Sequence, residues 1–258
     1  MTLGAPGHNP KAAIARLGPV YRWARRSRAL ARYLARRPHD VDFAAFGKLP
    51  GSGLFLDVGA SIGQSALSFR IFNREAPILS LEPLPGHRDD LRFVGRVIEG
   101  HRYMMVGAAE ESRTATLFVP MLGSYELPAE SSLSRDSAAG VLDRLEAEGV
   151  DRKRLTLKEV RVELRRLDDL ALDPSFVKID VEGAELAVLR GLQATLERSR
   201  PALMIERSDC YQEVASRLRE MSYAPYVYDA PADELRPYDG EQTVNVFFLQ
   251  PDWTNESR

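Results

Sequence analysis

The sequence has a single cysteine, Cys210, in 258 residues. This count excludes an internal disulfide framework and a cysteine-rich zinc site. The chain also lacks an uninterrupted apolar run of about 18 residues, which a membrane-spanning helix would need. Charged residues interrupt every apolar stretch from Lys11 onward, so we expect no secretory signal and a cytoplasmic location.

Acidic residues are absent from residues 1–39, which carry nine lysines and arginines. Since the whole chain has a net charge of −2, the remainder carries −11. Apolar spacing over residues 12–37 predicts a basic amphipathic helix that Pro19 either starts or breaks. Such a helix could contact a partner or lie peripherally on an anionic surface, here the inner membrane surface. The alternative is a solvated helix that packs on the edge of the domain.

Internal repeats and low-complexity tracts are also missing. The proportions of hydrophobic residues, 44%, and charged residues, 28%, are those of an ordinary globular protein. From residue 51 onward, predicted strands and helices alternate. We therefore expect a basic helical extension over 1–50, one α/β domain over 51–251 and a C-terminal tail over 252–258.

The first informative motif is a strand, a glycine turn and a helix. The apolar run 54–58 precedes Gly59 and Gly63, and helical spacing follows over 64–72. This is the opening unit of nucleotide-binding α/β sheets, and its glycines allow a ligand close to the backbone. Asp57 stands where the dinucleotide fingerprint has its first glycine. A carboxylate there would repel pyrophosphate but suits a cation such as S-adenosylmethionine. The alternative is an incidental turn.

A second buried strand is predicted over 77–81 and ends at Glu82-Pro83. Glu82 lies 25 residues after Asp57, close to the interval at which an acid meets ribose hydroxyls in such folds. Each charge-assisted hydrogen bond to a hydroxyl contributes about 1.5–3 kcal/mol. The alternative is that Glu82 caps the helix predicted over 86–93.

The middle of the chain offers weaker signals. A third strand, over 103–106, runs into small residues that include Ala108 and leave room for a flat ring. Strands are predicted over 114–119 and 155–164, and a helix over 138–148. Between them, residues 120–137 contain five serines and predict a long loop, of the kind that often forms a lid or a binding loop.

Acids end the next two predicted strands. Residues 176–179 lead to Asp180 and Glu182, and the strand over 202–206 ends in Glu206. Ligands bind beyond the carboxyl ends of parallel strands, so these side chains should point at the site. An extended backbone would put Asp180 and Glu182 on one face, whereas a turn would separate them. Alternatively, Glu182 or Glu185 caps the following helix. A helix over 209–221, closing strands over 223–228 and 243–249 and an acidic loop over 229–242 complete the chain.

Together these residues resemble the FkbM-type family of S-adenosylmethionine-dependent methyltransferases, over roughly residues 54–250. The resemblance rests on four motifs: 57–63, Glu82-Pro83, 167–170 and 177–183. It implies a class I methyltransferase (Rossmann-like) α/β fold: a seven-stranded, mostly parallel sheet with helices on both faces and a reversed last strand.

The resemblance also implies site residues. Expected cofactor contacts are Asp57, Gly59, Ala60, Ser61, Gly63, Glu82, Pro83 and Ala108. Ser131 and Ser132 match a serine pair of the family, and we expect them to bind substrate. Ala184 departs from the histidine that many members carry.

The expected reaction is O-methylation of a hydroxyl on a sugar, a glycan or glycolipid, or a natural product. Asp180 is the candidate base or hydroxyl-orienting group, with Glu182 and Glu206 as alternates. These three acids could hold Mg²⁺, but such groups are common without a metal, and a divalent metal is not favoured. The histidines form no ligand spacing, and we expect His87 on a helix surface.

Two other functions are considered. The first is a nicotinamide-dependent oxidoreductase on a related sheet, against which Asp57 argues. The second is a non-catalytic module that binds S-adenosylmethionine, or a partner through the basic segment. A nucleic-acid substrate is not expected, because the basic residues are confined to the N-terminal segment while the predicted catalytic domain is acidic. A small molecule or saccharide is the expected partner, and the oligomeric state stays open.

Overall fold

The computed structural model describes residues 18–255. The start of the predicted basic helix and the end of the predicted tail lie outside these residues. Within these residues the chain forms two compact units: the core unit, 29–114 with 162–255, and the second unit, 18–28 with 115–161. The predicted domain boundaries stay predictions. Within 18–255, no helix combines the length and the hydrophobicity that a membrane span requires.

The core unit is built on an eight-stranded sheet in the order β11-β10-β12-β9-β8-β1-β2-β3. The bounds of its strands are β1 Leu54–Val58, β2 Ile78–Leu81, β3 His101–Met104, β8 Pro174–Ile179, β9 Ala202–Glu206, β10 Ala224–Asp229, β11 Glu234–Pro237 and β12 Asn245–Leu249. β1 pairs in parallel with β2 and β8, whereas β12 runs antiparallel between β9 and β10. The predicted α/β class, the mostly parallel sheet and the reversed last strand are thus confirmed.

The eighth strand corrects the sequence prediction. Residues 229–242 were predicted as a loop, yet β11 lies within them and pairs with β10 as an antiparallel hairpin. β11 is an edge strand whose residues are exposed or half-buried. It therefore lacks the apolar run by which the buried strands were recognised.

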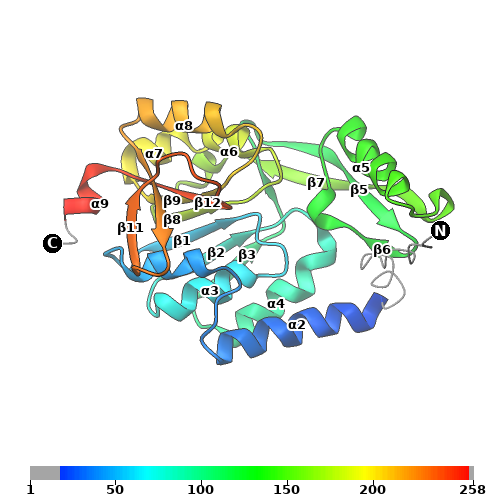
Figure 1. Ribbon diagram of the computed structural model, residues 1–258, viewed down its shortest axis with the longest axis horizontal. Helices are drawn as coiled ribbons and strands as arrows, with labels where there is room; N and C mark the ends of the chain where they lie inside the picture. Colours follow the sequence, from blue (N-terminus) through cyan, green and yellow to red (C-terminus); the bar gives the residue numbers. More distant parts are fainter. Residues whose placement is uncertain (1–17, 256–258) are drawn as a thin grey trace, which may run out of the picture. The chain divides into compact units, whose positions relative to one another are not determined.

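Helices cover both faces of the sheet (Figure 1). Helices α6 (Glu185–Gly191), α7 (Gln193–Ser199) and α8 (Tyr211–Glu220) pack on one face, against residues such as Leu56 and Val177. Helices α3 (Gln64–Phe72) and α4 (Arg88–Val97) pack on the other with the 3₁₀ helix η1 (Val41–Gly47). Each inner strand must be apolar on both sides, which explains its continuous hydrophobic run.

Residues 41–47 contribute directly to this core, although they precede the predicted α/β domain. Phe43 and Phe46 are almost completely buried. The Phe46 ring packs edge-on against Phe55 of β1 and Phe176 of β8, with centroids 5.5 and 5.8 Å apart. Part of the predicted N-terminal extension therefore helps to hold the sheet.

Helix α2 spans Gly18–Leu34, so Pro19 lies at its first turn and starts it, where the missing N–H costs nothing. The predicted membrane or partner contact of this segment stays a prediction. The remaining elements are η2 Pro85–His87, β4 Gly107–Ala108, β5 Arg113–Leu122, β6 Tyr125–Glu126, η3 Pro128–Glu130, α5 Arg135–Ala147, η4 Arg152–Arg154, β7 Leu155–Arg165, η5 Leu167–Leu170 and α9 Pro251–Asn255. Strands β4, β7, β5 and β6 form a second sheet in that order.

The predicted long loop over 120–137 is partly wrong. β5 continues to Leu122 and turns into β6, which pairs with it through Met121 and Leu122. Ser134 caps α5, because its side chain accepts a hydrogen bond from the Ser137 N–H. Serine was interpreted as a loop residue, but here one serine marks the start of a helix.

Candidate functional site

The glycine turn follows β1 and contacts the end of β8. Gly59 has a φ of +86° and Gly63 a φ of +83°, in the left-handed region that favours glycine. A Cβ on Gly59 would lie 1.8 Å from the Asp180 carbonyl oxygen, and one on Gly63 would lie 2.7 Å from Val94 Cγ2. These glycines are therefore required by backbone conformation and internal packing, which the sequence interpretation, based on ligand approach, did not include.

Replacing Gly59 with alanine is expected to lower the free energy of unfolding by about 2–4 kcal/mol, from backbone strain and the clash with Asp180. Urea denaturation would measure the loss. The control is Gly140→Ala in α5, where an added Cβ meets nothing within 4 Å. This control should be neutral or stabilising by up to about 1 kcal/mol. Equal stability of the two variants would contradict the expectation.

Asp57 lies beneath the turn and not on its surface. The residue is 0% exposed, and its Oδ2 accepts a hydrogen bond from Ser80 Oγ at 3.0 Å. Its Oδ1 has no hydrogen-bond partner within residues 18–255. Burial raises the pKa of Asp57 to about 6, although the Lys178 ammonium opposes the shift. A cationic ligand at the turn would be attracted electrostatically by this buried carboxylate. The predicted role of Asp57 in cofactor binding stays a prediction.

Glu82 ties the turn to the end of β2. Its Oε2 accepts the Ser61 N–H and its Oε1 accepts the Leu84 N–H, both at 2.8 Å. Each carboxylate oxygen keeps a second lone pair for a further donor. The prediction that His87 lies on a helix surface is wrong: it is 7% exposed, and its Nδ1 lies 3.4 Å from Glu82 Oε1. The cause is the short helix η2, which turns the ring inward before α4 begins.

The other predicted cofactor residues gather around this turn. Ala60 and Ala108 are buried, whereas Ser61 and Pro83 are half-buried. The Cβ of Pro83 lies 3.5 Å from where a Cβ on Gly107 would stand, so the end of β2 approaches β4. The structure thus brings these residues to neighbouring strand ends, and their contacts with a cofactor stay predictions.

The predicted serine pair belongs to the second unit. Ser131 Oγ donates to the Pro128 carbonyl, and the backbone of Ser132 pairs with that of Phe118. Both serines therefore have local structural partners. Their predicted contact with substrate stays a prediction.

Three acids form a cluster at the ends of β8 and β9. One carboxylate oxygen from each of Asp180, Glu182 and Glu206 lies within 4.8 Å of the others. The chain turns here, with φ values of +54° at Glu182 and +94° at Gly183, yet this turn does not separate the acids. Glu185, which is 0% exposed, accepts the Gly183 N–H at 3.0 Å.

Lys178 is the residue that the sequence interpretation missed. It is 3% exposed, and its Nζ donates to Asp180 Oδ2 at 2.7 Å. In the β1–β8 register it stands opposite Asp57. The available signal was its i, i+2 spacing from Asp180, which puts both side chains on one face of a strand. A buried ammonium therefore lies among the predicted site acids.

The pKa values of Asp180 and Glu206 are shifted in opposite directions. Burial raises the pKa of Asp180, but the Lys178 ammonium and hydrogen bonds outweigh it, so the net shift is downward. Burial, a hydrogen bond with Asp180 and its charge raise the pKa of Glu206 to about 8. At neutral pH the pair therefore shares one proton, with Asp180 ionised and Glu206 protonated.

The acid cluster also has the donor set of a hard cation. Mg²⁺ prefers oxygen ligands, and the cluster offers three carboxylates. The Lys178 ammonium, 2.7 Å from Asp180, would repel a second cation. This repulsion agrees with a metal being possible but not favoured, which stays a prediction.

The raised pKa of Glu206 predicts a pH-dependent stability. Because the folded-state pKa of about 8 lies above the ordinary glutamate value of 4.5, the contribution of Glu206 to stability is complete below about pH 4.5 and lost as pH rises through 8. As the pH rises from 5 to 9, the free energy of unfolding of Glu206→Gln should therefore increase relative to that of wild type by about 1–2 kcal/mol, after discounting for solvent screening. Denaturation at both pH values measures it, with exposed Glu213→Gln as the control. A pH-independent difference would contradict it.

Comparison with known proteins identifies the family. The model of the methyltransferase FkbM domain matches residues 57–226, which include the glycine turn and the acid cluster. Methyltransferase sdnD of Sordaria araneosa is 27% identical over 174 residues, 60% of this chain and 64% of the relative. Methyltransferase 1 of Beauveria bassiana is 27% identical over 156 residues, 55% of this chain and 59% of the relative. The chain thus spans less than two thirds of each of these relatives.

The comparison with solved structures agrees with the family match. The crystal structure of methyltransferase FkbM from Methylobacillus flagellatus matches with a TM-score of 0.50 and 16% identity, and the match covers 79% of this chain and 48% of that chain. At this identity the likeness supports the fold alone. The family match spans the motifs and their structural setting, and the chain therefore belongs to the FkbM family of methyltransferases.

Proposed function

We propose that this methyltransferase uses S-adenosylmethionine to methylate a hydroxyl of a sugar, a glycan or glycolipid, or a natural product. The observation that carries the proposal is the position of Asp180. Its carboxylate is held 2.7 Å from a buried lysine, and its backbone N–H donates to the Val58 carbonyl at 3.0 Å, beside the glycine turn. A charged group that can accept a proton thus lies next to the turn that would hold the cofactor.

The residues at the turn fit a cationic nucleoside. Asp57 contributes a buried carboxylate whose Oδ1 has no partner within residues 18–255, and Glu82 keeps lone pairs for ribose hydroxyls. Ser61 and Ala108 would contact the remainder of the nucleoside. S-adenosylmethionine supplies, when bound, a methyl group on a positively charged sulfur, and its transfer leaves a neutral thioether.

Asp180 would orient the acceptor and take its proton. Its carboxylate accepts a hydrogen bond from the acceptor hydroxyl and receives the hydroxyl proton as the new oxygen–carbon bond forms. A low pKa does not prevent this, because a hydroxyl becomes strongly acidic as its oxygen bonds to carbon. Lys178 keeps Asp180 ionised, and the protonated Glu206 donates to it. A positioned base typically contributes about 10²–10⁴-fold to the rate.

The test is transfer of isotope-labelled methyl from S-adenosylmethionine into sugars, glycolipids and natural-product alcohols. We expect a methyl ether on one acceptor class and one demethylated cofactor per methyl transferred. Cofactor binding without transfer would favour the non-catalytic module. Binding of a nicotinamide dinucleotide in its place would overturn the proposal, although membership of a methyltransferase family already disfavours that function.

A further inference from the structure

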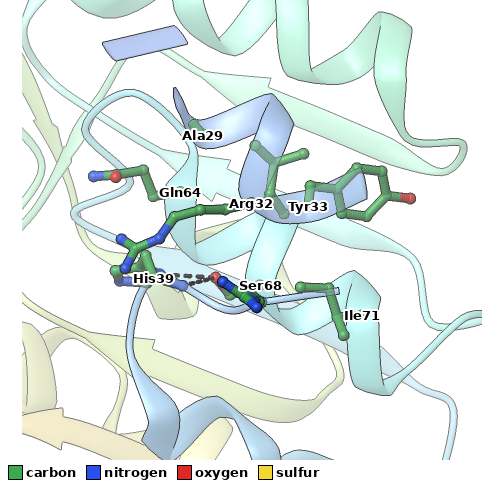
Figure 2. Close-up of a pocket in the computed structure, with 9 residues that line it drawn as sticks. Ala29, Arg32, Tyr33, His39, Gln64, Ser68 and Ile71 are labelled. Carbon is green, nitrogen blue, oxygen red and sulfur yellow. Dashed lines mark hydrogen bonds between the residues drawn. The ribbon is translucent and has the colours of Figure 1, made fainter. Parts of the chain in front are cut away.

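A shallow hollow lies in the core unit between the C-terminal end of α2, the segment that follows it, and α3 (Figure 2). Arg32 comes from α2, Arg37 and His39 from the following segment, and Gln64 and Ser68 from α3. In Figure 2 the Arg32 side chain extends toward His39. No residue described above as part of the cofactor turn or the acid cluster lines this hollow.

The hollow is positively charged. It is lined by two arginines and by no aspartate or glutamate. Within residues 18–255, neither the Arg32 nor the Arg37 guanidinium makes a hydrogen bond or an ion pair, whereas the guanidinium of their neighbour Arg36 donates to the Ile71 carbonyl at 3.4 Å. Unpaired guanidinium groups at a concave site favour carboxylates and phosphates, which they can bind through two parallel hydrogen bonds.

His39 adds a neutral donor. Its backbone N–H donates to Ser68 Oγ at 2.9 Å, and its ring Nδ1 lies 2.8 Å from the same oxygen. Burial, with the charge of Lys178, lowers the pKa of His39 to about 4, so the ring is neutral at physiological pH. The Ser68 hydroxyl can then donate to Nδ1, which leaves the ring hydrogen on Nε2. In this tautomer the ring offers a donor, as an oxyanion requires.

Two connections place the hollow beside the proposed reaction centre. Gln64 directly follows Gly63 of the glycine turn. On the other side, Asp40, which follows His39, accepts a hydrogen bond from Asn245 Nδ2 at 2.7 Å, and Asn245 stands opposite Glu206 in the β9–β12 register. The hollow is therefore linked through Gln64 to the cofactor turn, and through Asp40 and Asn245 to β9, the strand that ends in Glu206.

We propose that this hollow binds an acidic group, a carboxylate or a phosphate, that the methyl acceptor carries. The inference rests on the proposed function, because it assigns an acceptor subsite of the same reaction. An anion subsite would restrict the possible methyl acceptors to hydroxyl compounds that also carry a negative charge, such as acidic sugars and hydroxy acids of natural products. Arg32 and Arg37 would bind the charge while Asp180 accepts the hydroxyl proton.

The first test needs no methyl transfer. Inorganic phosphate, compared with chloride at equal ionic strength, should raise the melting temperature of the whole chain. Arg32→Gln should lose this shift, with at least about fivefold weaker phosphate binding in titration calorimetry. Arg28→Gln is the matched control, because Arg28 is an exposed arginine of the same helix outside the hollow. Equal phosphate binding by wild type and Arg32→Gln would overturn the inference.

The second test compares each acidic acceptor with its neutral amide or dephosphorylated counterpart. Wild type and Arg28→Gln should favour the acidic member by at least about tenfold in kcat/KM, through KM, which corresponds to about 1.4 kcal/mol. Arg32→Gln should lose most of this preference. Arg32→Gln could instead weaken cofactor binding and keep the preference for acidic acceptors. Arg32 would then bind a negative group of the cofactor and not of the acceptor, and the inference would be overturned. Arg32-dependent phosphate binding without methylation of any acceptor would overturn the proposed function but not the anion site.

Discussion

Asp180→Asn is expected to lower the rate of methyl transfer by about 10²–10⁴-fold while the chain still binds S-adenosylmethionine. The amide has nearly the shape of the carboxylate, so the turn contact through the Asp180 backbone should remain. What is lost is a negatively charged acceptor for the hydroxyl proton. Single-turnover transfer of labelled methyl, together with calorimetric titration of the cofactor, measures the two effects separately.

The control for this variant is Asp209→Asn, which changes an exposed aspartate outside the acid cluster. It should transfer methyl at the wild-type rate. Unchanged turnover in Asp180→Asn would show that the base was assigned to the wrong residue. Loss of cofactor binding along with turnover would mean that Asp180 acts in binding and not in proton transfer.

The second large effect is expected at Lys178. Lys178→Met should destabilise the fold by about 3–5 kcal/mol, because it removes the counter-charge from two neighbouring acids. Asp57 is completely buried and Asp180 is held 2.7 Å from the ammonium. Methionine has a similar length and is apolar, so packing is largely kept. Urea denaturation at pH 7 measures the loss.

A matched control separates the buried ion pair from an exposed one. Lys158 pairs with Glu126 at 2.6 Å but is half exposed, so Lys158→Met should cost at most about 1 kcal/mol. The double variant Asp57→Asn, Lys178→Met should be more stable than the sum of the single effects predicts, since it removes one unpaired charge. A cost at Lys178 no larger than that at Lys158 would contradict the role of this ammonium.

Much of the fold could be predicted from local pattern. The run 54–58 and the spacing over 64–72 correspond to β1 and α3, because a buried parallel strand and an amphipathic helix each impose a period on the sequence. The edge strand β11 and the helix start at Ser134 were missed. An exposed edge strand buries too little to leave an apolar signature, and serine is common both in loops and at helix caps.

Three carboxylates of the candidate site were found from sequence because parallel strands end at a common edge. Asp180 follows β8 and Glu206 ends the adjacent strand β9, so their proximity could be inferred once the strand order was assumed. Lys178 was overlooked although it lies two residues before Asp180. Asn245 and Asp40 could not have been paired from sequence, because 205 residues separate them and only the closing strand brings them together.

The sequence by itself determined the type of the fold and the family, because the turn glycines, the apolar runs and the strand-terminal acids are local features of the chain. Only the tertiary structure decided what each charged group experiences. It buries Asp57 beneath the turn, sets Lys178 against Asp180 and leaves Glu206 with a proton at neutral pH. The physical reason is that burial and electrostatic interaction depend on neighbours from distant parts of the chain, whereas periodicity depends on adjacent ones.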